Sequence, residues 1–560
     1  MGNVPHVLVL GGGYAAITLT KALRRRIENG QIECTVVSRE NFHAFHGFVG
    51  EMLTGKITPS NILSPARRLF PPARLHLAEV EKIDLDSRTV ITSRSLDGRR
   101  AEHTYDHLVV ALGTEDRVDV YPGLAEHAFK LRRYADCFAL RNHLLEMFEL
   151  AEIETDPDER RRLLTFFIAG GGYAGTEVAG ELAHFARTLA GREYPGLRAD
   201  ECRFLLVEPG DTIVPELYGA RGEGAKAHPR LVEKAMGRQR ELGVEVLTNT
   251  YVMAATPNEV VLSNGDHIPA RTIISAVGTK AAPVVDRLQV EKDERGRIVT
   301  DRALRVPGRP GVWAAGDCAA VPLPRGEGTC PPVAVYALKH GHKVGDNIGR
   351  VADGQRPRRF KFPGVGQGAS VGNRYAVAEV KGVEVWGLPA WLLWRGYLYF
   401  HFPTWDRRLR LLADWVLWPL VGRDIVEMRV ARPEDYELRE NRFQPGETIL
   451  VEGGGSRYVH VIVEGEVELV EVARGEERVL KVIGPGEHFG VRWMESFEPE
   501  EARAKTEVRT IAIRRDQAPR LQEVLAAAGR IVAESGHFPA ITREMESAMA
   551  SRPSPTPPAT

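Results

Sequence analysis

The sequence predicts an α/β protein built on two parallel sheets, with a smaller all-β module near its C-terminus. Residues 4–25 and 163–186 each run from an apolar stretch through a glycine triplet with Tyr into a helical pattern. Both apolar stretches are continuous, as in parallel strands that are buried on both faces. Residues 440–515 instead hold short runs of alternating hydrophobicity separated by turns with glycine, which is typical of antiparallel β-structure.

Composition excludes several classes of protein. The 560 residues suffice for three or four domains of about 150 residues each. With 74 Lys and Arg against 75 Asp and Glu, the net charge of −1 gives no general attraction for nucleic acid. The five cysteines form no CxxC pair, which argues against a disulfide framework, a zinc ribbon or an adjacent redox dithiol. We therefore expect no metal site.

The N-terminal sequence and the hydropathy pattern bear on localisation. The first residues lack the basic, apolar and small-residue regions of a signal peptide. No stretch of 18 uncharged apolar residues occurs, so we expect no helix that spans a bilayer. These patterns predict a cytoplasmic protein, with attachment to a membrane surface still open.

The first glycine-rich turn fits a dinucleotide pyrophosphate. Gly11, Gly13 and Ala16 take the three positions of GxGxxG/A. There the first residue makes a tight turn, the second lets the backbone approach the pyrophosphate, and the third lets the helix pack on the strand. The acid expected after the next strand is displaced, because Arg39 and Glu40 come only after CTVVS. Glu40 either binds the ribose or lies in a solvated loop.

The second turn repeats this pattern in full with Gly170, Gly172 and Gly175. Two such turns in the same strand–turn–helix context predict two Rossmann-like dinucleotide-binding units, the second inserted within the first. The strand RFLLVE ends at Glu208, whose carboxylate suits the two ribose hydroxyls of NAD. No Arg follows in PGDTIVPE to accept a 2′-phosphate, so NADH is favoured over NADPH.

A third signal is VWAAGDCA at residues 312–319. A short buried strand that ends in Gly-Asp before a helix can aim Asp317 at a polyol hydroxyl. Asp317 could instead be a helix N-cap, but its place after two dinucleotide motifs favours the cofactor role. The segments 105–114 and 272–279 have the pattern of strand-to-turn crossings, one after each unit.

With these residues in view, positions 1 to about 430 resemble the type II NADH dehydrogenases, which are single-subunit NADH:quinone oxidoreductases. The segments that carry the resemblance are SRENFHAF, GKITPSNILSPAR, GLAEHAFKLRRYADCFALRNHLLEMFE, GYAGTEVAGEL, LLVEPGDTIVPEL, WAAGDCA, PPVAVYALKHG and WLLWRGY. The resemblance implies an enzyme whose FAD takes hydride from NADH and passes electrons to a membrane quinone. The family is often dimeric, so it also implies a possible homodimer.

The resemblance assigns residues to each cofactor. For FAD they are Gly11, Gly13, Ala16, Arg39, Glu40, Val80, Ala111, Gly113, Thr114, Asp317, Ala334 and Val335. For NADH they are Gly170, Gly172, Gly175, Glu208 and Gly278. Glu177 would be the catalytic residue beside both rings, where its carboxylate orients the nicotinamide or relays protons. Alternatively, Glu177 is only a first-turn acid favoured by the helix dipole.

Two residues depart from the family at the edge where the acceptor would bind. Val335 replaces a Gln and offers no side-chain hydrogen bond. His46 also stands where Gln is common. These changes leave an acceptor other than quinone as an alternative within the enzyme class. A redox or nucleotide sensor with little turnover is the alternative from another class.

Residues 386–423 are rich in Trp and Arg and favour peripheral membrane binding. Six of the eight Trp lie here, and residues 390–423 carry five Arg against two Asp, a local charge of about +3. Trp rings prefer the membrane interface, and Arg is attracted to anionic lipid. The resemblance agrees, placing the protein on the inner face of the cell membrane. The alternative is that these aromatic residues form a protein core.

The module near the C-terminus resembles the β-roll of cyclic nucleotide-binding domains. FQPGETILVEGGG, HVIVEGEVELV and IGPGEHFG place Gly446, Gly465 and Gly486 at turns. Val491 stands where the family has the Glu that binds ribose, which makes cyclic-nucleotide binding doubtful. Arg503 is either a phosphate partner or a solvated surface charge. A structural or docking role for the β-roll is favoured.

These patterns together predict six regions. They are an FAD-binding domain in two parts (1–160 and 286–355), an NAD-binding domain (161–285), a Trp-rich membrane region (356–432), a β-roll (433–537) and a disordered Pro-rich tail (538–560).

Overall fold

A computed structural model of the chain describes residues 4–94, 99–218, 227–428, 439–450, 458–473, 476–490 and 501–514. The predictions for Val491 and for the tail 538–560 lie outside these residues. The chain divides into two compact units. Unit 1 comprises Met1–Val118, Phe129–Tyr251 and Thr272–Glu427, and unit 2 comprises Asp119–Ala128, Val252–Arg271 and Met428–Thr560.

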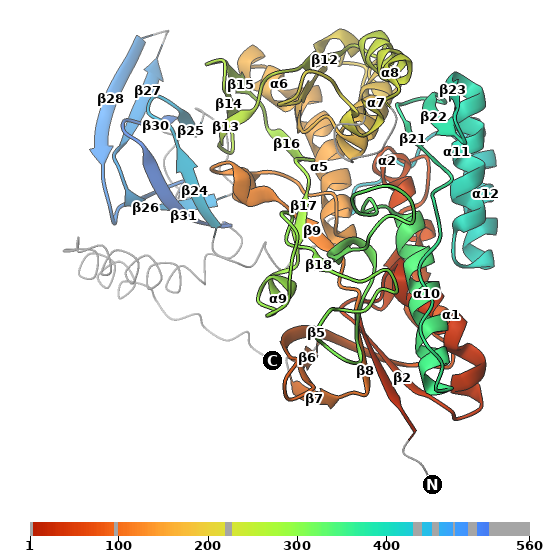
Figure 1. The fold of residues 1–560 in the computed structure, drawn as a ribbon. Helices are drawn as coiled ribbons and strands as arrows, with labels where there is room; N and C mark the ends of the chain where they lie inside the picture. The colour runs from red at the N-terminus through yellow and green to blue at the C-terminus, as the bar shows by residue number, and fades with distance from the viewer. Residues whose placement is uncertain are drawn as a thin grey trace, which may run out of the picture. The chain divides into compact units, whose positions relative to one another are not determined.

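The larger sheet of unit 1 has the strand order β19-β8-β1-β2-β5-β6-β7. Its strands are β1 (His6–Leu10), β2 (Glu33–Ser38), β5 (Arg74–Asp84), β6 (Thr89–Arg94), β7 (Arg100–Thr104), β8 (His107–Val110) and β19 (Val312–Ala314). The pairs from β19 to β5 are parallel, and β6 and β7 add an antiparallel hairpin. Helices α1 (Tyr14–Glu28) and α10 (Ala334–Ala352) lie side by side along this part of the molecule (Figure 1).

The second sheet of unit 1 is wholly parallel, in the order β12-β11-β10-β16. Its strands are β10 (Thr165–Ala169), β11 (Arg203–Val207), β12 (Val244–Leu247) and β16 (Thr272–Ser275), and its helices are α7 (Tyr173–Leu189) and α8 (Pro229–Glu241). Every residue of β10 and β16 is buried, as the continuous apolar patterns predict. The two parallel sheets confirm the predicted α/β fold class.

Other elements lie between these strands in the sequence. They are β3 (Phe42–Ala44), η1 (His46–Phe48), α2 (Val49–Leu53), η2 (Pro59–Ile62), β4 (Leu63–Pro65), α3 (Ala66–Leu69), β9 (Thr114–Asp116), η3 (Val118–Val120), α5 (Tyr134–Ile153), α6 (Pro157–Leu163), η4 (Ala199–Glu201), η5 (Pro215–Tyr218), β17 (Thr279–Ala281), α9 (Pro283–Asp286), β18 (Ile298–Val299), η6 (Gly316–Cys318) and β20 (Ala319–Ala320).

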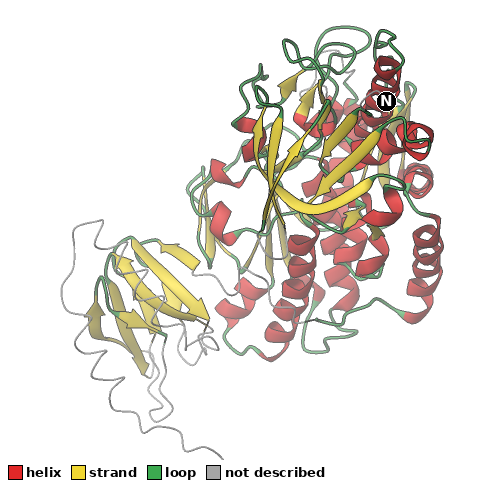
Figure 2. Ribbon diagram, turned by 90° about the horizontal axis from the view of Figure 1, so that it is seen from below, coloured by secondary structure: helices red, strands yellow, loops and turns green. Residues whose placement is uncertain are grey.

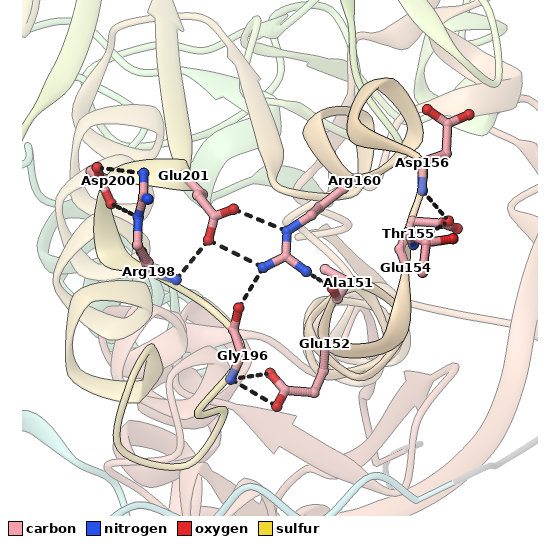
Figure 3. A network of polar contacts seen from close by, with 10 residues as sticks. All are labelled: Ala151, Glu152, Glu154, Thr155, Asp156, Arg160, Gly196, Arg198, Asp200 and Glu201. Atoms are coloured by element: carbon pink, nitrogen blue, oxygen red, sulfur yellow. Dashed lines mark hydrogen bonds and ion pairs between the residues drawn. The ribbon is translucent and has the colours of Figure 1, made fainter.

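The charged segment between α5 and α6 is an ordered junction (Figure 3). Asp156 caps α6 by accepting a hydrogen bond from the Asp158 amide at 2.8 Å. Arg160 donates to the carbonyl of Ala151 at 2.6 Å and pairs with Glu201 at 3.0 Å. These contacts fix the entry into β10, and therefore the position of the second glycine turn.

Unit 1 ends in a small sheet and two helices. The antiparallel strands are β21 (Gly366–Ser370), β22 (Ala376–Val380) and β23 (Val383–Trp386), followed by α11 (Gly387–His401) and α12 (Trp405–Val421). Figure 1 shows the two helices as a neighbouring pair.

Unit 2 contains the meander β13 (Val252–Ala255), β14 (Glu259–Leu262) and β15 (His267–Pro269), the short helix α4 (Leu124–His127) and the β-roll. The β-roll has two four-stranded sheets, in the orders β24-β31-β26-β29 and β25-β30-β27-β28 (Figure 2). Its strands are β24 (Arg439–Phe443), β25 (Thr448–Leu450), β26 (Tyr458–Glu464), β27 (Val467–Ala473), β28 (Glu476–Ile483), β29 (His488–Phe489), β30 (Glu501–Ala504) and β31 (Val508–Arg514). Gly446, Gly465 and Gly486 have φ of 85°, 87° and 92°, as their predicted places in turns require.

Candidate active site

The first glycine turn leaves room for a ligand at one position only. Gly11 has φ of 106°, and a Cβ there would lie 2.2 Å from the carbonyl oxygen of Ala111. Gly13 begins α1 with φ of −81°, and a Cβ there would meet no atom within 4 Å. Ala16 is fully buried. The turn is therefore closed toward the protein and open at Gly13, where a pyrophosphate would approach the helix N-terminus.

The residues after β2 are exposed. Ser38 Oγ donates to the carbonyl of Glu40 at 2.9 Å. Arg39 lies 3.5 Å from Glu79 in an exposed ion pair. Glu40 is exposed, so both alternatives for it stay open. Val80 is buried in β5 at a local irregularity of the β5–β6 pairing.

The crossing after β8 also fits a bound polar group. Ala111 donates its amide to Leu10 and flanks the first turn. Gly113 has φ of 68°, and a Cβ there would meet nothing within 4 Å. Thr114 Oγ1 is buried and has no hydrogen-bond partner among the described residues. An unpaired buried hydroxyl beside open space suits the hydroxyl-rich chain of FAD.

Asp317, in η6, is part of an ion pair that the sequence did not reveal. Arg132 Nη2 donates to Asp317 Oδ2. The backbone amide of Arg132 donates to Asp116 at 3.2 Å, and the Arg132 carbonyl accepts from His46 Nε2 at 2.6 Å. The pair joins segments from three parts of the sequence. Arg132 lies in the block FKLRRYADC, where its charge was visible but its partner was not.

The second glycine turn repeats the geometry of the first. Gly170 has φ of 102°, and a Cβ there would lie 2.4 Å from the carbonyl oxygen of Ala276. Gly175 lies so close to Gly170 that an added Cβ would come within 1.9 Å of its carbonyl oxygen. Gly172 is the N-cap of α7. The three glycines thus allow strand, helix and turn to meet without side chains.

Glu208 and Gly278 flank this second turn. Glu208 is buried, and its carboxylate accepts hydrogen bonds from the amides of Gly171 at 2.7 Å and Gly210 at 3.1 Å. The acid is thereby fixed at the end of β11, the position from which a ribose is bound in such folds. Gly278 has φ of 106° and open space where a Cβ would be.

A cavity in unit 1 brings together residues from α2, α7, β21 and α11. It is small and partly open, and its empty space of about 390 Å³ includes the solvent at its mouth. It is lined by Gly47, Phe48, Gly50, Glu51, Glu177, Glu181, Ser370, Trp391, Trp394, Arg395 and Leu398. Three carboxylates, one guanidinium and several aromatic rings therefore share one small space.

Glu177 is the predicted catalytic residue, and it lies in this cavity. Its Oε1 accepts a hydrogen bond from the Ser370 amide at 2.9 Å. Burial raises the pKa of Glu177 to about 8, and the carboxylates of Glu181 and Glu51 act in the same direction. Burial therefore favours the protonated form of this carboxyl group, which suits a proton donor.

Glu51 and Arg395 form a buried ion pair in this cavity, which the sequence did not indicate. Arg395 Nη2 donates to Glu51 Oε2 at 3.0 Å, and Trp415 Nε1 donates to the same oxygen at 3.1 Å. The guanidinium lies 3.8 Å from the ring centre of Trp415 and 4.5 Å from that of Trp391. Glu51 is the only hydrogen-bonding partner of Arg395 among the described residues, so N–H groups remain for a ligand.

The third carboxylate of the cavity is held as an anion. Glu181 Oε2 accepts from Lys56 Nζ at 2.5 Å, and Oε1 accepts from the Asn373 amide at 3.2 Å. Burial alone would raise the pKa of Glu181, but Lys56 and then Arg423 lower it overall. Glu177 and Glu181 are thus similar carboxylates one helical turn apart with opposite pKa shifts.

The residues that depart from the family pattern lie at α10 and η1. Ala334 begins α10 and is exposed, and Val335 is half-buried against the core. His46 begins η1 and is committed to the Arg132 carbonyl. Neither Val335 nor His46 lines the cavity.

Helices α11 and α12 expose a set of mainly aliphatic side chains, which we call their outer face. Its exposed side chains are Leu388, Leu392, Leu393, Phe400, Trp405, Leu409, Leu412, Val416, Leu417, Leu420 and Val421. Trp405 is 73% exposed, whereas Trp386, Trp391, Trp394 and Trp415 pack against cores. In the described part of the chain no helix has the length and apolar character needed to cross a bilayer.

Arg503, the candidate ligand residue of the β-roll, lies on β30. Its guanidinium donates to Glu501 Oε1 at 2.8 Å, so it is engaged by a carboxylate of its own strand. The segment that contains Val491 is outside the described residues.

Comparison with protein families gives two matches. Residues 5–341 match the pyridine nucleotide-disulphide oxidoreductase family. Residues 440–523 match the cyclic nucleotide-binding domain.

Individual relatives agree with these matches. The type II NADH:quinone oxidoreductase NdhA of Mycobacterium tuberculosis is 29% identical over 454 residues, which cover 78% of this chain and 91% of that protein. The type II NADH:quinone oxidoreductase of Staphylococcus aureus is 26% identical, covering 69% and 92%. Among solved structures, NDH2 from Plasmodium falciparum in complex with NADH has a TM-score of 0.68 at 15% identity, covering 76% of this chain and all of that one. That structural likeness shows the same fold.

Proposed function

The chain belongs to the pyridine nucleotide-disulphide oxidoreductase family, and from this premise we propose that it is an FAD-dependent NADH dehydrogenase that passes electrons to a membrane quinone. The observation that carries the proposal is the pair of glycine turns together with a cavity that is lined by the buried carboxyl group of Glu177. The relatives named as type II NADH:quinone oxidoreductases support the same activity.

The residues of the first turn fit FAD, and those of the second fit NADH. FAD would be held by Gly11, Gly13 and the crossing at Ala111–Thr114, with Asp317 and Arg132 near its polyol chain. NADH would be held by the Gly170 turn with Glu208 on its ribose. When bound, FAD supplies the two-electron chemistry between the nicotinamide and the acceptor.

Proton supply is the task that falls to the protein. Reduction of a quinone by NADH consumes one proton from solution in addition to the hydride. The raised pKa of Glu177 favours its protonated form, and the Ser370 amide donates to Oε1, which leaves Oε2 to carry the proton. We assign Glu177 as the residue that gives this proton to the reduced acceptor.

The cavity has the chemistry to bind a quinone. Phe48, Trp391, Trp394 and Leu398 offer apolar contact to a flat ring. Arg395 offers N–H donors to a carbonyl oxygen, and Glu51 with the two flanking Trp rings fixes its plane. An apolar Val335 outside the cavity is compatible with this site, because Arg395 takes over the hydrogen-bonding role that a Gln would have.

Attachment to a membrane surface is part of the proposal. The outer face of α11 and α12 carries a row of exposed aliphatic residues, and apolar patches of this kind mark interaction surfaces. A quinone dissolved in lipid would reach the cavity most directly if this face lies in the headgroup region. We propose peripheral attachment to the inner face of the cell membrane, and a homodimer as the assembly. The predicted domain boundaries remain proposals of the same kind.

The test is the absorption spectrum of the purified protein during anaerobic addition of NADH, followed by a short-chain quinone. We expect the flavin band to bleach with NADH and to return with the quinone. Bleaching without return would leave a dehydrogenase with a different acceptor. Absence of bleaching would favour the sensor.

A further inference from the structure

The β-roll is fastened to the meander β13–β15 by buried polar side chains, all of them within unit 2. Glu447, in the first turn of the β-roll, accepts hydrogen bonds from Thr256 Oγ1 at 2.5 Å and from Asn258 Nδ2 at 3.3 Å. Asn258 Nδ2 also donates to the carbonyl of Thr448 at 2.9 Å. Thr256, Asn258 and Glu447 are all buried. We call these three residues the Glu447 latch.

The latch is a specific contact. A carboxylate taken out of water is unfavourable unless donors surround it. Burial raises the pKa of Glu447 to about 7, while its bonds from Thr256, the Gln444 amide and Asn258 act the other way. Two of these donors, Thr256 and Asn258, come from the meander, so they fix the placement of the turn on it, because losing either one leaves a buried polar atom unsatisfied.

Asn258 extends the latch to the strand that follows the meander. Arg271 Nη1 donates to Asn258 Oδ1, and the Ala270 amide donates to the Asn258 carbonyl at 2.8 Å. Arg271 is followed in the chain directly by Thr272, the first residue of β16. The residue that contacts Glu447 therefore also holds the segment from which β16 begins.

Within unit 1, β16 leads to the second glycine turn. It is the edge strand of its sheet, with β10 on one side. On the other side the Phe129 amide donates to the Ile273 carbonyl and the Ser275 amide donates to the Phe129 carbonyl, each at 2.8 Å. At its end, the Ala276 amide donates to the Ala169 carbonyl at 2.7 Å. The Ala276 carbonyl lies where any side chain on Gly170 would collide with it. A displacement of β16 along its axis would therefore disturb the turn.

We propose that the Glu447 latch couples the β-roll to NADH binding: when the latch is closed, β16 holds the Gly170 turn in the geometry that binds the dinucleotide. The identity of that dinucleotide rests on the proposed function. No residue that lines the acceptor cavity belongs to this chain of contacts. The coupling therefore acts first at the Gly170 turn, so a ligand or partner that moves the β-roll would regulate the enzyme at the NADH step.

The sequence offers a matched pair of variants for the test. Glu447 ends the turn QPGE and Glu487 ends the turn GPGE. Each caps its own turn by accepting the amide three residues earlier, from Gln444 and Gly484, at 2.9 Å in both cases. The second carboxylate oxygen of Glu487 pairs with Lys481 of the β-roll itself, at 2.7 Å. Glu487→Ala therefore removes a turn cap without touching the latch, and Glu447→Ala removes both.

The experiment compares both variants with the unaltered full-length, flavin-loaded protein. The NADH dissociation constant is taken from the concentration dependence of flavin reduction in stopped flow, and amide hydrogen exchange is followed over residues 252–276. For Glu447→Ala we expect faster exchange in this segment, NADH binding weakened by about fivefold or more, and an unchanged KM for a short-chain quinone. Glu487→Ala should match the unaltered protein in all three measurements.

An NADH constant for Glu447→Ala within twofold of that for Glu487→Ala would overturn the coupling, whether or not exchange changes. Glu447→Gln keeps one acceptor oxygen and should give a smaller shift in the same direction, which supplies the comparison if the alanine variant fails to fold. Absence of flavin reduction in the unaltered protein would count against the proposed function alone. In that case the affinity for NAD⁺, measured by titration calorimetry on the same variants, still decides for or against the coupling.

Discussion

At the scale of single residues, Glu177 and Glu181 show how position decides chemistry. Both lie on α7 and line the same cavity. Lys56 pairs with Glu181 and keeps it ionised, whereas burial without a cation partner raises the pKa of Glu177 to about 8. The sequence indicated Glu177 through its family motif. It did not indicate Lys56, Glu51 or Arg395, because each lies more than 100 residues from its partner.

Glu177→Gln should lower kcat roughly a hundredfold, since proton donation contributes about that much or more. In the unaltered protein, activity should fall as pH rises through about 8, where Glu177 loses its proton, and this limb should be absent in the variant. The measurement is kcat against pH with a short-chain quinone. Glu28→Gln, at an exposed acid at the end of α1, is the control, and an unchanged alkaline limb in Glu177→Gln would refute the role.

The same substitution should affect stability with a predictable sign. Folding raises the pKa of Glu177 from its ordinary value of 4.5 to about 8. Burial of this group therefore does not lower the free energy of unfolding below pH 4.5, where it is protonated in both states, and lowers it most above about pH 8, where it is ionised in both. A neutral Gln avoids this cost. Glu177→Gln should therefore raise Tm at pH 8.5 more than at pH 4.5, as measured by thermal unfolding.

Gly13→Ala tests the FAD assignment without disturbing the fold. A Cβ at Gly13 would meet no protein atom within 4 Å, and its φ of −81° suits any residue. The protein should fold normally and yet retain at least about tenfold less flavin, because the methyl group occupies the place of the pyrophosphate. The circular dichroism spectrum checks that the variant folds, and the flavin content checks the loss of FAD. Full flavin retention would contradict the assignment.

Arg395→Lys tests the acceptor site. Lysine keeps the positive charge beside Glu51 but loses the planar fork that Trp391 and Trp415 hold. We expect the KM for quinone to rise about tenfold, because loss of one hydrogen bond to a charged group weakens binding by at least about that factor. The rate of flavin reduction by NADH should be unchanged. A change in that rate with constant KM would show that Arg395 acts elsewhere.

At the scale of elements, the glycine turns and their strands could be read from the sequence. Local rules suffice for them, since a continuous apolar strand, a tight turn and a helix start follow within about 20 residues. The role of the Trp-rich segment was harder to predict. Its Trp residues were expected at a membrane interface, yet four pack inward and the exposed face is mainly aliphatic. The composition of the segment indicated an exposed apolar surface, but only the packing shows which of its side chains are exposed.

Replacing Leu417 and Leu420 on α12 by Glu should abolish flotation with anionic liposomes. Both side chains are exposed in the aliphatic outer face, so the change adds charge without leaving a cavity in the core. Oxidation of NADH with a water-soluble quinone should persist. The control is Glu at Val479 and Val482, which are exposed on β28 of the β-roll. Continued flotation of the α12 variant would remove this face from consideration.

At the scale of the whole molecule, the fold class could be predicted from the sequence, whereas the contacts that hold unit 2 together could not. The meander at residues 252–271 belongs to the unit that contains the β-roll. The contacts responsible join Thr256 and Asn258 to Glu447, about 190 residues away. No local pattern reveals such pairs, because each side chain is ordinary in its own sequence context.

Added FAD should stabilise one unit selectively. The hydrophobic clusters of unit 1 and of the β-roll share no residue, so we expect two unfolding transitions in calorimetry. A thousandfold excess of FAD over its Kd should add about 4 kcal/mol to the transition of unit 1 only. Equal shifts of both transitions would show that the units unfold as one.

Because unit 2 gathers two internal loops as well as the C-terminal part, no single cut separates it from the rest. A shortened protein that ends near residue 428 would keep the meander but lose the β-roll. Thr256 and Asn258 would then lack Glu447, their hydrogen-bonding partner. Such a fragment would lack the partner of these polar side chains, so its properties would differ from those of unit 1 in the full-length protein. Truncation at this point therefore changes the surroundings of the meander as well as removing the β-roll.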